Sequence, residues 1–145
     1  MSAGTERICC VRTGKQTNSG GLGKWLAVVA GTNQNELAKA GANVGILGIT
    51  LEIVTATDRP QQYCMACGCC VLPWTASASI GRLTGGVPTQ IITAANGKCA
   101  KLPTAPGDYT VVGEMDNDSA DASGDGDVVH VKLYGAPLTV TVPGS

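Results

Sequence analysis

The sequence predicts an all-β fold: a small β-sandwich or barrel of short antiparallel strands with an extended N-terminal arm. Apolar and polar residues alternate over several short stretches, a period that is typical of strands with one buried face. Turn signals separate these stretches roughly every ten residues, because the chain carries 20 glycines and 7 prolines. It has no phenylalanine, so we expect a core of Val, Ile, Leu, Ala and Cys.

The expected arm covers residues 1–23, and the single β domain covers residues 24–145. The arm is polar, has three basic residues against the single acid Glu6, and ends in "TNSGGLG". A segment of this composition is disordered alone or becomes ordered on a partner. The residues that we expect to contact a partner or a neighbouring subunit are Arg7, Arg12, Lys15 and Trp25.

Strands are expected over residues 24–30, 44–54, 63–72, 109–115, 127–135 and 137–144. Residues 87–102 read as a hairpin, because Asn96-Gly97 supplies the positive φ angles that a tight turn requires. Residues 34–41 suggest one short helix that stops at Gly41.

The segment "YCMACGCCV", Tyr63–Val71, holds four of the 7 cysteines. Its spacing, Cys-x2-Cys-x-Cys-Cys, is not that of a regular zinc site, which usually takes two ligand pairs from separate chain positions. On an extended strand Cys64 and Cys70 would share one face, and Cys67 and Cys69 the other. One metal ion could not then collect all four thiols.

Buried packing is therefore the first interpretation of this segment, since reduced cysteine behaves as a small hydrophobe. Two alternatives stay open. The first is a metal site, with Cys64, Cys67, Cys69 and Cys70 as its candidate ligands. The second is disulfide bonding, within or between subunits, with Cys9, Cys10 and Cys99 as candidate partners.

We expect no enzymatic activity and no cofactor. His130 is the only histidine, and no local motif places a nucleophile and an acid beside it. The acidic loop over residues 114–127 departs from a calcium-binding loop at Ala120 and Asp121. It is interpreted as a solvated surface loop, and a weak cation site there remains an alternative.

Charge and hydropathy exclude further classes. The formal net charge is -1, whereas a nucleic-acid-binding protein needs a clustered basic surface. No apolar run reaches the length of a membrane span, and the first residues lack the apolar region of a secretory signal. With an odd number of cysteines, this predicts a protein made in a reducing compartment.

Three stretches between about residues 25 and 135 carry a resemblance: "AVVAGTNQNELAKAGANVGILGIT", "GGVPTQIITAANGKCAKL" and "YTVVGEMDNDSADASGDGDVVHVKLYG". In this order they resemble the capsid decoration (cement) proteins of tailed bacteriophages. The matching residues are Gly45, Ile46, Gly48, Gly97, Lys98, Val112, Gly113, Gly126, Asp127, Val129, Val131 and Leu133. The chain departs from the family at its cysteine cluster and at Cys99, where the family would have alanine.

The resemblance implies a virion structural protein that is made in the host cytoplasm and binds the outside of an icosahedral head. Its implied partners are the major capsid protein and itself, as a homotrimer at threefold positions, where it stabilises contacts between capsid subunits. The family brings no catalytic residues. The alternatives are a metal-binding module or enzyme built on the cysteine cluster, and another virion part such as a head fibre or a tail-tube component.

Overall fold

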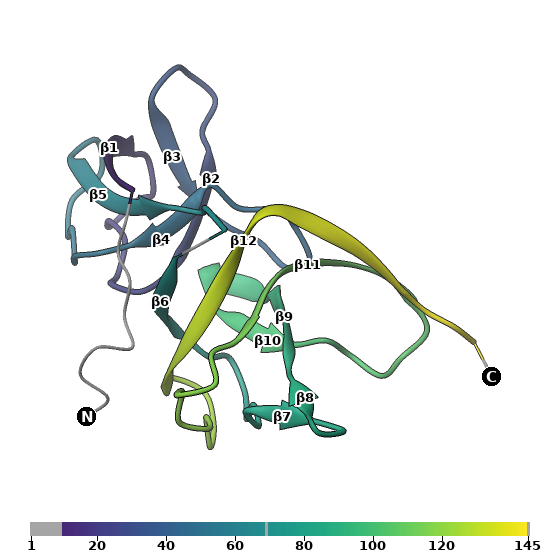
Figure 1. Ribbon diagram of the computed structural model, residues 1–145. Helices are drawn as coiled ribbons and strands as arrows, with labels where there is room; N and C mark the ends of the chain where they lie inside the picture. The colour runs from purple at the N-terminus through teal and green to yellow at the C-terminus, as the bar shows by residue number, and fades with distance from the viewer. Residues whose placement is uncertain (1–9, 69, 145) are drawn as a thin grey trace.

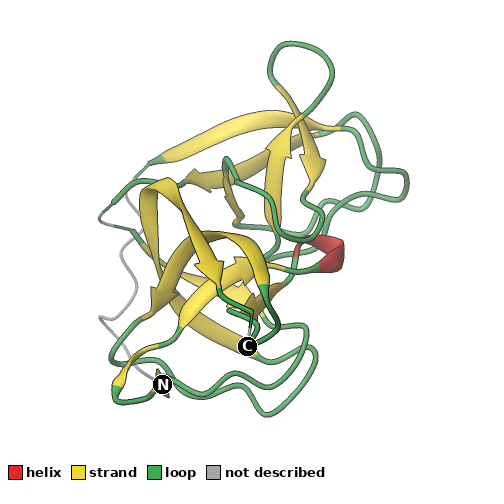
Figure 2. Ribbon diagram, turned by 90° about the vertical axis from the view of Figure 1, so that its right-hand side faces the viewer, coloured by secondary structure: helices red, strands yellow, loops and turns green. Residues whose placement is uncertain are grey.

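The computed structural model describes residues 10–68 and 70–144, and this part of the chain is all-β, as predicted (Figure 1). Its only helical element is a 3-10 turn, η1, at Ala95–Gly97, drawn in red in Figure 2. Among the described residues, no helix is both long and apolar enough to span a bilayer.

The first half of the chain closes into a small barrel with the strand order β1-β3-β2-β4-β5. All neighbours in the barrel are antiparallel except β1 and β3, which pair parallel. The sequence predicts antiparallel strands, and this one parallel pair is the exception to that prediction. The bounds are Val11–Gln16 for β1, Ala27–Ala30 for β2, Glu36–Lys39 for β3, Gly48–Thr50 for β4 and Pro60–Met65 for β5.

The structure differs from the predicted arm over residues 1–23. Residues 1–9, which include Arg7, lie outside the described residues, but Val11–Gln16 form β1. This strand pairs with β5 over five residues and also pairs with β3. The predicted arm thus contributes a strand to the barrel, and Gln16 is fully buried there.

The second half forms a five-stranded sheet in the order β10-β9-β11-β12-β6. A separate two-stranded hairpin, β7–β8, lies between β6 and β9 in the sequence. The bounds are Val71–Thr75 for β6, Leu83–Thr84 for β7, Val87–Pro88 for β8, Gln90–Thr93 for β9, Cys99–Lys101 for β10, Gly107–Met115 for β11 and Val128–Val142 for β12.

The predicted hairpin at residues 87–102 is confirmed in its β9–β10 part, which pairs antiparallel with Thr93 opposite Cys99. Asn96 has φ 63° and Gly97 has φ 73°, so both residues of the predicted turn adopt the left-handed region. The carbonyl of Gly97 accepts a hydrogen bond from the indole N–H of Trp74, at 2.8 Å.

The last two predicted strands, 127–135 and 137–144, are one continuous strand, β12. Its first part lies between β6 and β11, but beyond Lys132 it pairs with β11 alone. The resulting two-stranded ribbon leaves the body of the molecule and carries the C-terminus (Figure 1). Pro137, the first residue of the second predicted strand, lies where the β11–β12 register is interrupted, so no ladder hydrogen bond needs its missing N–H.

One large buried cluster joins the barrel to the sheet. Ala27, Ile49 and Cys64 enter it from the barrel, whereas Trp74 and Leu133 enter it from the sheet. A second, smaller cluster of Leu22, Val28 and Leu37 fills the barrel itself. The core contains aliphatic side chains and cysteines, as expected, but also Trp74 and Met115, which lie outside the expected set of Val, Ile, Leu, Ala and Cys.

Two further predictions are wrong in detail. The segment expected to be a short helix, 34–41, holds strand β3, because its apolar Leu37 is needed inside the barrel. The stretch 44–54 is a strand only at Gly48–Thr50, with one isolated bridge from Val54 to Leu22, and a bend at Glu52 leaves Ile53 67% exposed, not on the buried face.

Candidate interaction surface

Two of the predicted contact residues lie on β1 of the barrel, three positions apart and therefore on opposite faces of the strand. Arg12 and Lys15 are both exposed, while Gly14 between them is buried against Leu37. Arg12 pairs through its backbone with Tyr63 of β5. The structure therefore brings these two basic side chains onto one strand, as their short separation in sequence requires.

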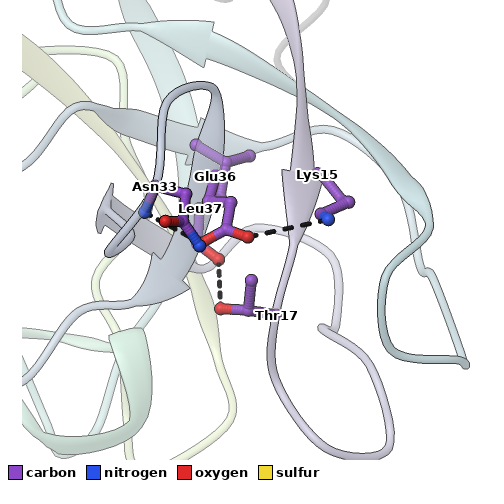
Figure 3. Close-up of polar contacts among 5 residues, drawn as sticks. All are labelled: Lys15, Thr17, Asn33, Glu36 and Leu37. Atoms are coloured by element: carbon purple, nitrogen blue, oxygen red, sulfur yellow. Dashed lines mark hydrogen bonds and ion pairs between the residues drawn. The ribbon is translucent and has the colours of Figure 1, made fainter.

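Lys15 is already engaged within the molecule (Figure 3). Its Nζ lies 3.6 Å from Oε2 of Glu36 on β3, and its side chain remains 50% exposed. The backbone N–H and the side-chain amide of Asn33 donate to Oε1 of the same carboxylate, at 3.0 and 3.2 Å. These two Asn33 bonds, ahead of the Lys15 charge, hold the pKa of Glu36 below its usual value.

The polar contacts of Lys15, Asn33 and Glu36 connect β1 with β3 and the loop before it. The Thr17 hydroxyl donates to the carbonyl of Leu37 at 3.0 Å and continues the parallel pairing past the end of β1 (Figure 3). An exposed ion pair such as Lys15–Glu36 is weak in water. Lys15 can therefore exchange Glu36 for an acidic group on a partner at little cost.

Trp25 lies elsewhere and has a structural role. Its backbone N–H donates to the carbonyl of Thr50 at 3.1 Å, and its carbonyl accepts from the N–H of Thr75 at 3.0 Å. It therefore connects the barrel to β6 of the sheet. Its half-buried ring packs against the main core, and Lys24 Nζ lies 4.4 Å from the ring centroid, a cation–π distance.

The cysteine segment does not run as one strand. β5 ends at Met65, the chain turns, and β6 begins at Val71. The N–H of Cys70 donates to the carbonyl of Cys67 at 3.1 Å, which closes the turn. The prediction that Cys64 and Cys67 point to opposite faces of one long strand is therefore wrong for the segment as a whole, and Cys69 lies outside the described residues.

The turn gathers sulfur atoms that a strand would separate. Sγ of Cys70 lies 2.6 Å from Sγ of Cys67 and 3.7 Å from Sγ of Cys64. Sγ of Cys10, which precedes β1, lies 3.7 Å from Sγ of Cys67. Cys64 and Cys70 are fully buried, whereas Cys10 and Cys67 are half-buried.

Buried packing, the first interpretation of these thiols, describes Cys64, Cys70 and Cys99, all of which are in the main core. Burial raises the pKa of Cys99 to about 12, so this thiol stays protonated at neutral pH. Within residues 10–68 and 70–144, no group of three or more His, Cys, Asp or Glu side chains has an arrangement that could hold a metal ion.

The acidic loop before β12 is fastened to the rest of the molecule. Asp127 accepts bonds from the N–H and hydroxyl of Ser123, at 2.8 and 2.7 Å. These bonds, the hydroxyl first, lower the pKa of Asp127. Asp125 contacts Lys98 at 2.7 Å, so part of the acidic charge is used within the protein.

His130 and its neighbours on β12 also serve the fold. The backbone N–H of His130 donates to the hydroxyl of Ser119 at 2.9 Å. The hydroxyl of Tyr134 donates to Glu114 at 3.0 Å, and burial, followed by this carboxylate, raises the tyrosine pKa to about 12. These contacts tie β12 to β11 and to the acidic loop.

Sequence reasoning missed an apolar groove at the outer end of the sheet. The β7–β8 hairpin, the segment after β10 and the end of β12 enclose a cavity of about 400 Å³. Its apolar walls include Val87, which is 61% exposed, Leu102 and Val142. The groove depends on segments far apart in the chain, so no local motif could have indicated it.

No protein-family model and no curated protein matches this chain. Among solved structures, it is similar to the N base of head fiber gp8.5 in bacteriophage phi29, with a TM-score of 0.62 and 15% sequence identity. The similarity covers 88% of this chain and 96% of that one. At this identity, the likeness establishes a shared fold over almost the whole of both chains.

Proposed function

We propose that this protein is a structural component of a bacteriophage head, bound to the outside of the capsid. The observation that carries the proposal is the likeness to a head-fibre base over 88% of this chain and 96% of that one. The resemblance of residues 25–135 to capsid decoration proteins supports it independently, because it rests on the order of sequence motifs. The proposal requires no catalysis.

The proposed partners are the major capsid protein and further copies of this chain. A homotrimer at a threefold position would present three copies of each contact, and linked contacts bind more tightly than one. On the chain itself, Arg12 and Lys15 are the proposed contact residues, because they are exposed and share one strand. Arg7 is a further candidate outside the described residues. Trp25 is a weaker candidate, since its backbone and ring serve the barrel–sheet junction.

Binding to heads that lack this chain tests the proposal. Purified protein is mixed with such heads, and the amount that sediments with them is measured. Wild-type protein should saturate the heads at a fixed number of copies. The double variant Arg12→Glu, Lys15→Glu should bind at least about tenfold more weakly, since two reversed charges oppose an acidic surface.

Lys101→Glu is the matched control, because Lys101 is also exposed on a strand but lies on β10. It should bind as the wild type does. Failure of the wild-type protein to sediment with heads would contradict the capsid role. Wild-type binding by the double variant would contradict only the assignment of Arg12 and Lys15.

The fibre-base and cement forms of this proposal predict different effects on the shell. A cement protein bridges capsid subunits, so adding it should raise the temperature at which heads lose their DNA. The base of a fibre needs only an anchoring point, so the same temperature should stay unchanged at full occupancy. The solved neighbour favours the fibre base, whereas the sequence resemblance favours cement.

A further inference from the structure

We propose that Cys67 and Cys70 are an oxidation site: a low-molecular-weight disulfide converts them into an intramolecular disulfide that closes the turn between β5 and β6. This inference rests on the thiol geometry and is independent of the proposed function.

The backbone of the turn already has the geometry of a cross-link. The hydrogen bond from the N–H of Cys70 to the carbonyl of Cys67 joins residues i and i+3 at 3.1 Å. In turns of this kind the two Cα atoms lie within about 7 Å. Disulfides span Cα separations of about 4.4–6.8 Å, so the spacing of such a turn is compatible with a disulfide.

The side chains are aligned as well. The two Sγ atoms lie 2.6 Å apart, inside van der Waals contact and within about 0.6 Å of a disulfide bond length. The other two sulfur pairs, Cys64–Cys70 and Cys10–Cys67, are at 3.7 Å, an ordinary contact. Among the sulfur pairs of the described residues, Cys67 and Cys70 are therefore the pair closest to bonding distance.

The exposure of the two thiols sets the order in which they react with the oxidant. Cys67 is half-buried, whereas Cys70 is fully buried, so the oxidant meets Cys67 first. The Cys67 thiolate attacks one sulfur of the oxidant, breaks its S–S bond and releases one thiol, which leaves a mixed disulfide on Cys67. The Cys70 thiolate then attacks Sγ of Cys67 and displaces the second thiol.

The exchange balances in protons and electrons. Cys67 and Cys70 together lose two protons and two electrons, and the oxidant gains them as it becomes two thiols. Cys64 lies beside the site but is fully buried, and Cys10 must move to reach bonding distance. Cys99 stays reduced, because it is buried at β10 with its pKa raised to about 12.

The Cys67–Cys70 disulfide would strengthen the connection between the barrel and the sheet. The turn connects the last strand of the barrel to the first strand of the sheet. Closing it covalently holds that connection against local opening, and the effect is reversible by an excess of thiol.

The test uses the full chain and 2-hydroxyethyl disulfide as the oxidant. After incubation and an acid quench, the protein is denatured, the remaining thiols are alkylated, and the whole-protein mass counts them. Tandem mass spectrometry of the chymotryptic peptide Cys64–Trp74, whose bond after Leu72 is protected by Pro73, then locates the disulfide. We expect a pair of protected thiols with no oxidant adduct, linked between Cys67 and Cys70.

Three variants assign the pair. Cys67→Ala, at a half-buried position, should lose the protected pair while its circular dichroism spectrum matches that of the wild type. Cys10→Ala and Cys69→Ala should keep it. Loss of the pair in Cys10→Ala, its persistence in Cys67→Ala, a fragment pattern that links any other pair, or a stable adduct as the sole product would each overturn the proposal.

Discussion

At the scale of single residues, steric room explains why some motif glycines are needed. A Cβ on Gly48 of β4 would overlap the backbone carbonyl of Cys64 on β5. A Cβ on Gly113 would lie 2.6 Å from the carbonyl of Lys132, at the irregularity of the β11–β12 ladder. Both glycines belong to the motifs that resemble decoration proteins, so their presence has a physical reason in this fold. Gly45 differs, since its Cβ would make only an ordinary contact with Pro137.

Gly48→Ala should therefore destabilise the protein strongly. The overlapping atom belongs to the backbone, so relief requires the barrel to shift, at a cost of about 3 kcal/mol. The free energy of unfolding, measured with urea, checks this. Gly41→Ala is the control: Gly41 has open space around its Cβ position, and its variant should unfold at the wild-type midpoint. Equal midpoints for both variants would contradict the close packing of β4 against β5.

Cys99 gives the protein a predictable response to alkali. Its pKa is about 12 in the folded protein against an ordinary value of 9.0, so folding favours the protonated thiol. The stability that this preference contributes is fully present below pH 9 and is lost as the pH rises toward 12. Cys99→Ala removes this dependence. The difference in unfolding free energy between wild type and variant should be constant from pH 7 to 8.5 and shrink steadily between pH 9.5 and 11. A difference that stays constant to pH 11 would contradict the buried, neutral thiol.

At the scale of elements, Asn43 links the barrel side of the molecule to the β11–β12 ribbon. Its backbone is left-handed, with φ 55°. Its Nδ2 donates to the carbonyl of Asp108 at 3.2 Å, and its Oδ1 accepts from the N–H of Thr110 at 2.7 Å. One side chain thus mimics a short strand partner along the start of β11.

Asn43→Gly should loosen this edge while keeping the backbone turn, since glycine adopts positive φ freely. Loss of the bond to Thr110 costs about 1 kcal/mol, so the Thr110 amide should exchange with solvent roughly fivefold faster. Hydrogen exchange followed by NMR checks this. Asn35→Gly provides the control, because Asn35 also has positive φ, 62°, but lies before β3. Thr110 exchange at the wild-type rate in Asn43→Gly would show that the side chain does not hold β11.

Strand signals in the sequence were strongest where pairing is local. The β9–β10 hairpin and β11 could be predicted because the turn residues and the alternation lie within one short segment. The parallel pairing of β1 with β3 and the merging of two predicted strands into β12 could not. Both depend on partners distant in the chain. The cysteine turn between β5 and β6 could not be predicted either. Its alternation is typical of a strand, but the chain crosses there from the barrel to the sheet.

At the scale of the whole molecule, one continuous core makes the barrel and the sheet a joined body, with the β11–β12 ribbon extending from it (Figure 1). The candidate surface was predicted in part. Arg12 and Lys15 are both exposed on β1, as expected, whereas the apolar groove by β7–β8 depends on long-range folding. Trp25, His130, Asp125 and Asp127 make contacts that serve the fold, whereas the exposed residues of β1 and the groove are open to a partner.

The central claim is that this chain sits on the outside of a phage head. A cryo-electron microscopy map of purified particles of the phage that encodes the chain tests it most directly. The account predicts density on the capsid surface that fits the barrel and the five-stranded sheet, with Arg12 and Lys15 at a contact with the shell or a neighbouring copy. Density for this fold in the tail, or its absence from the particle, would contradict the claim.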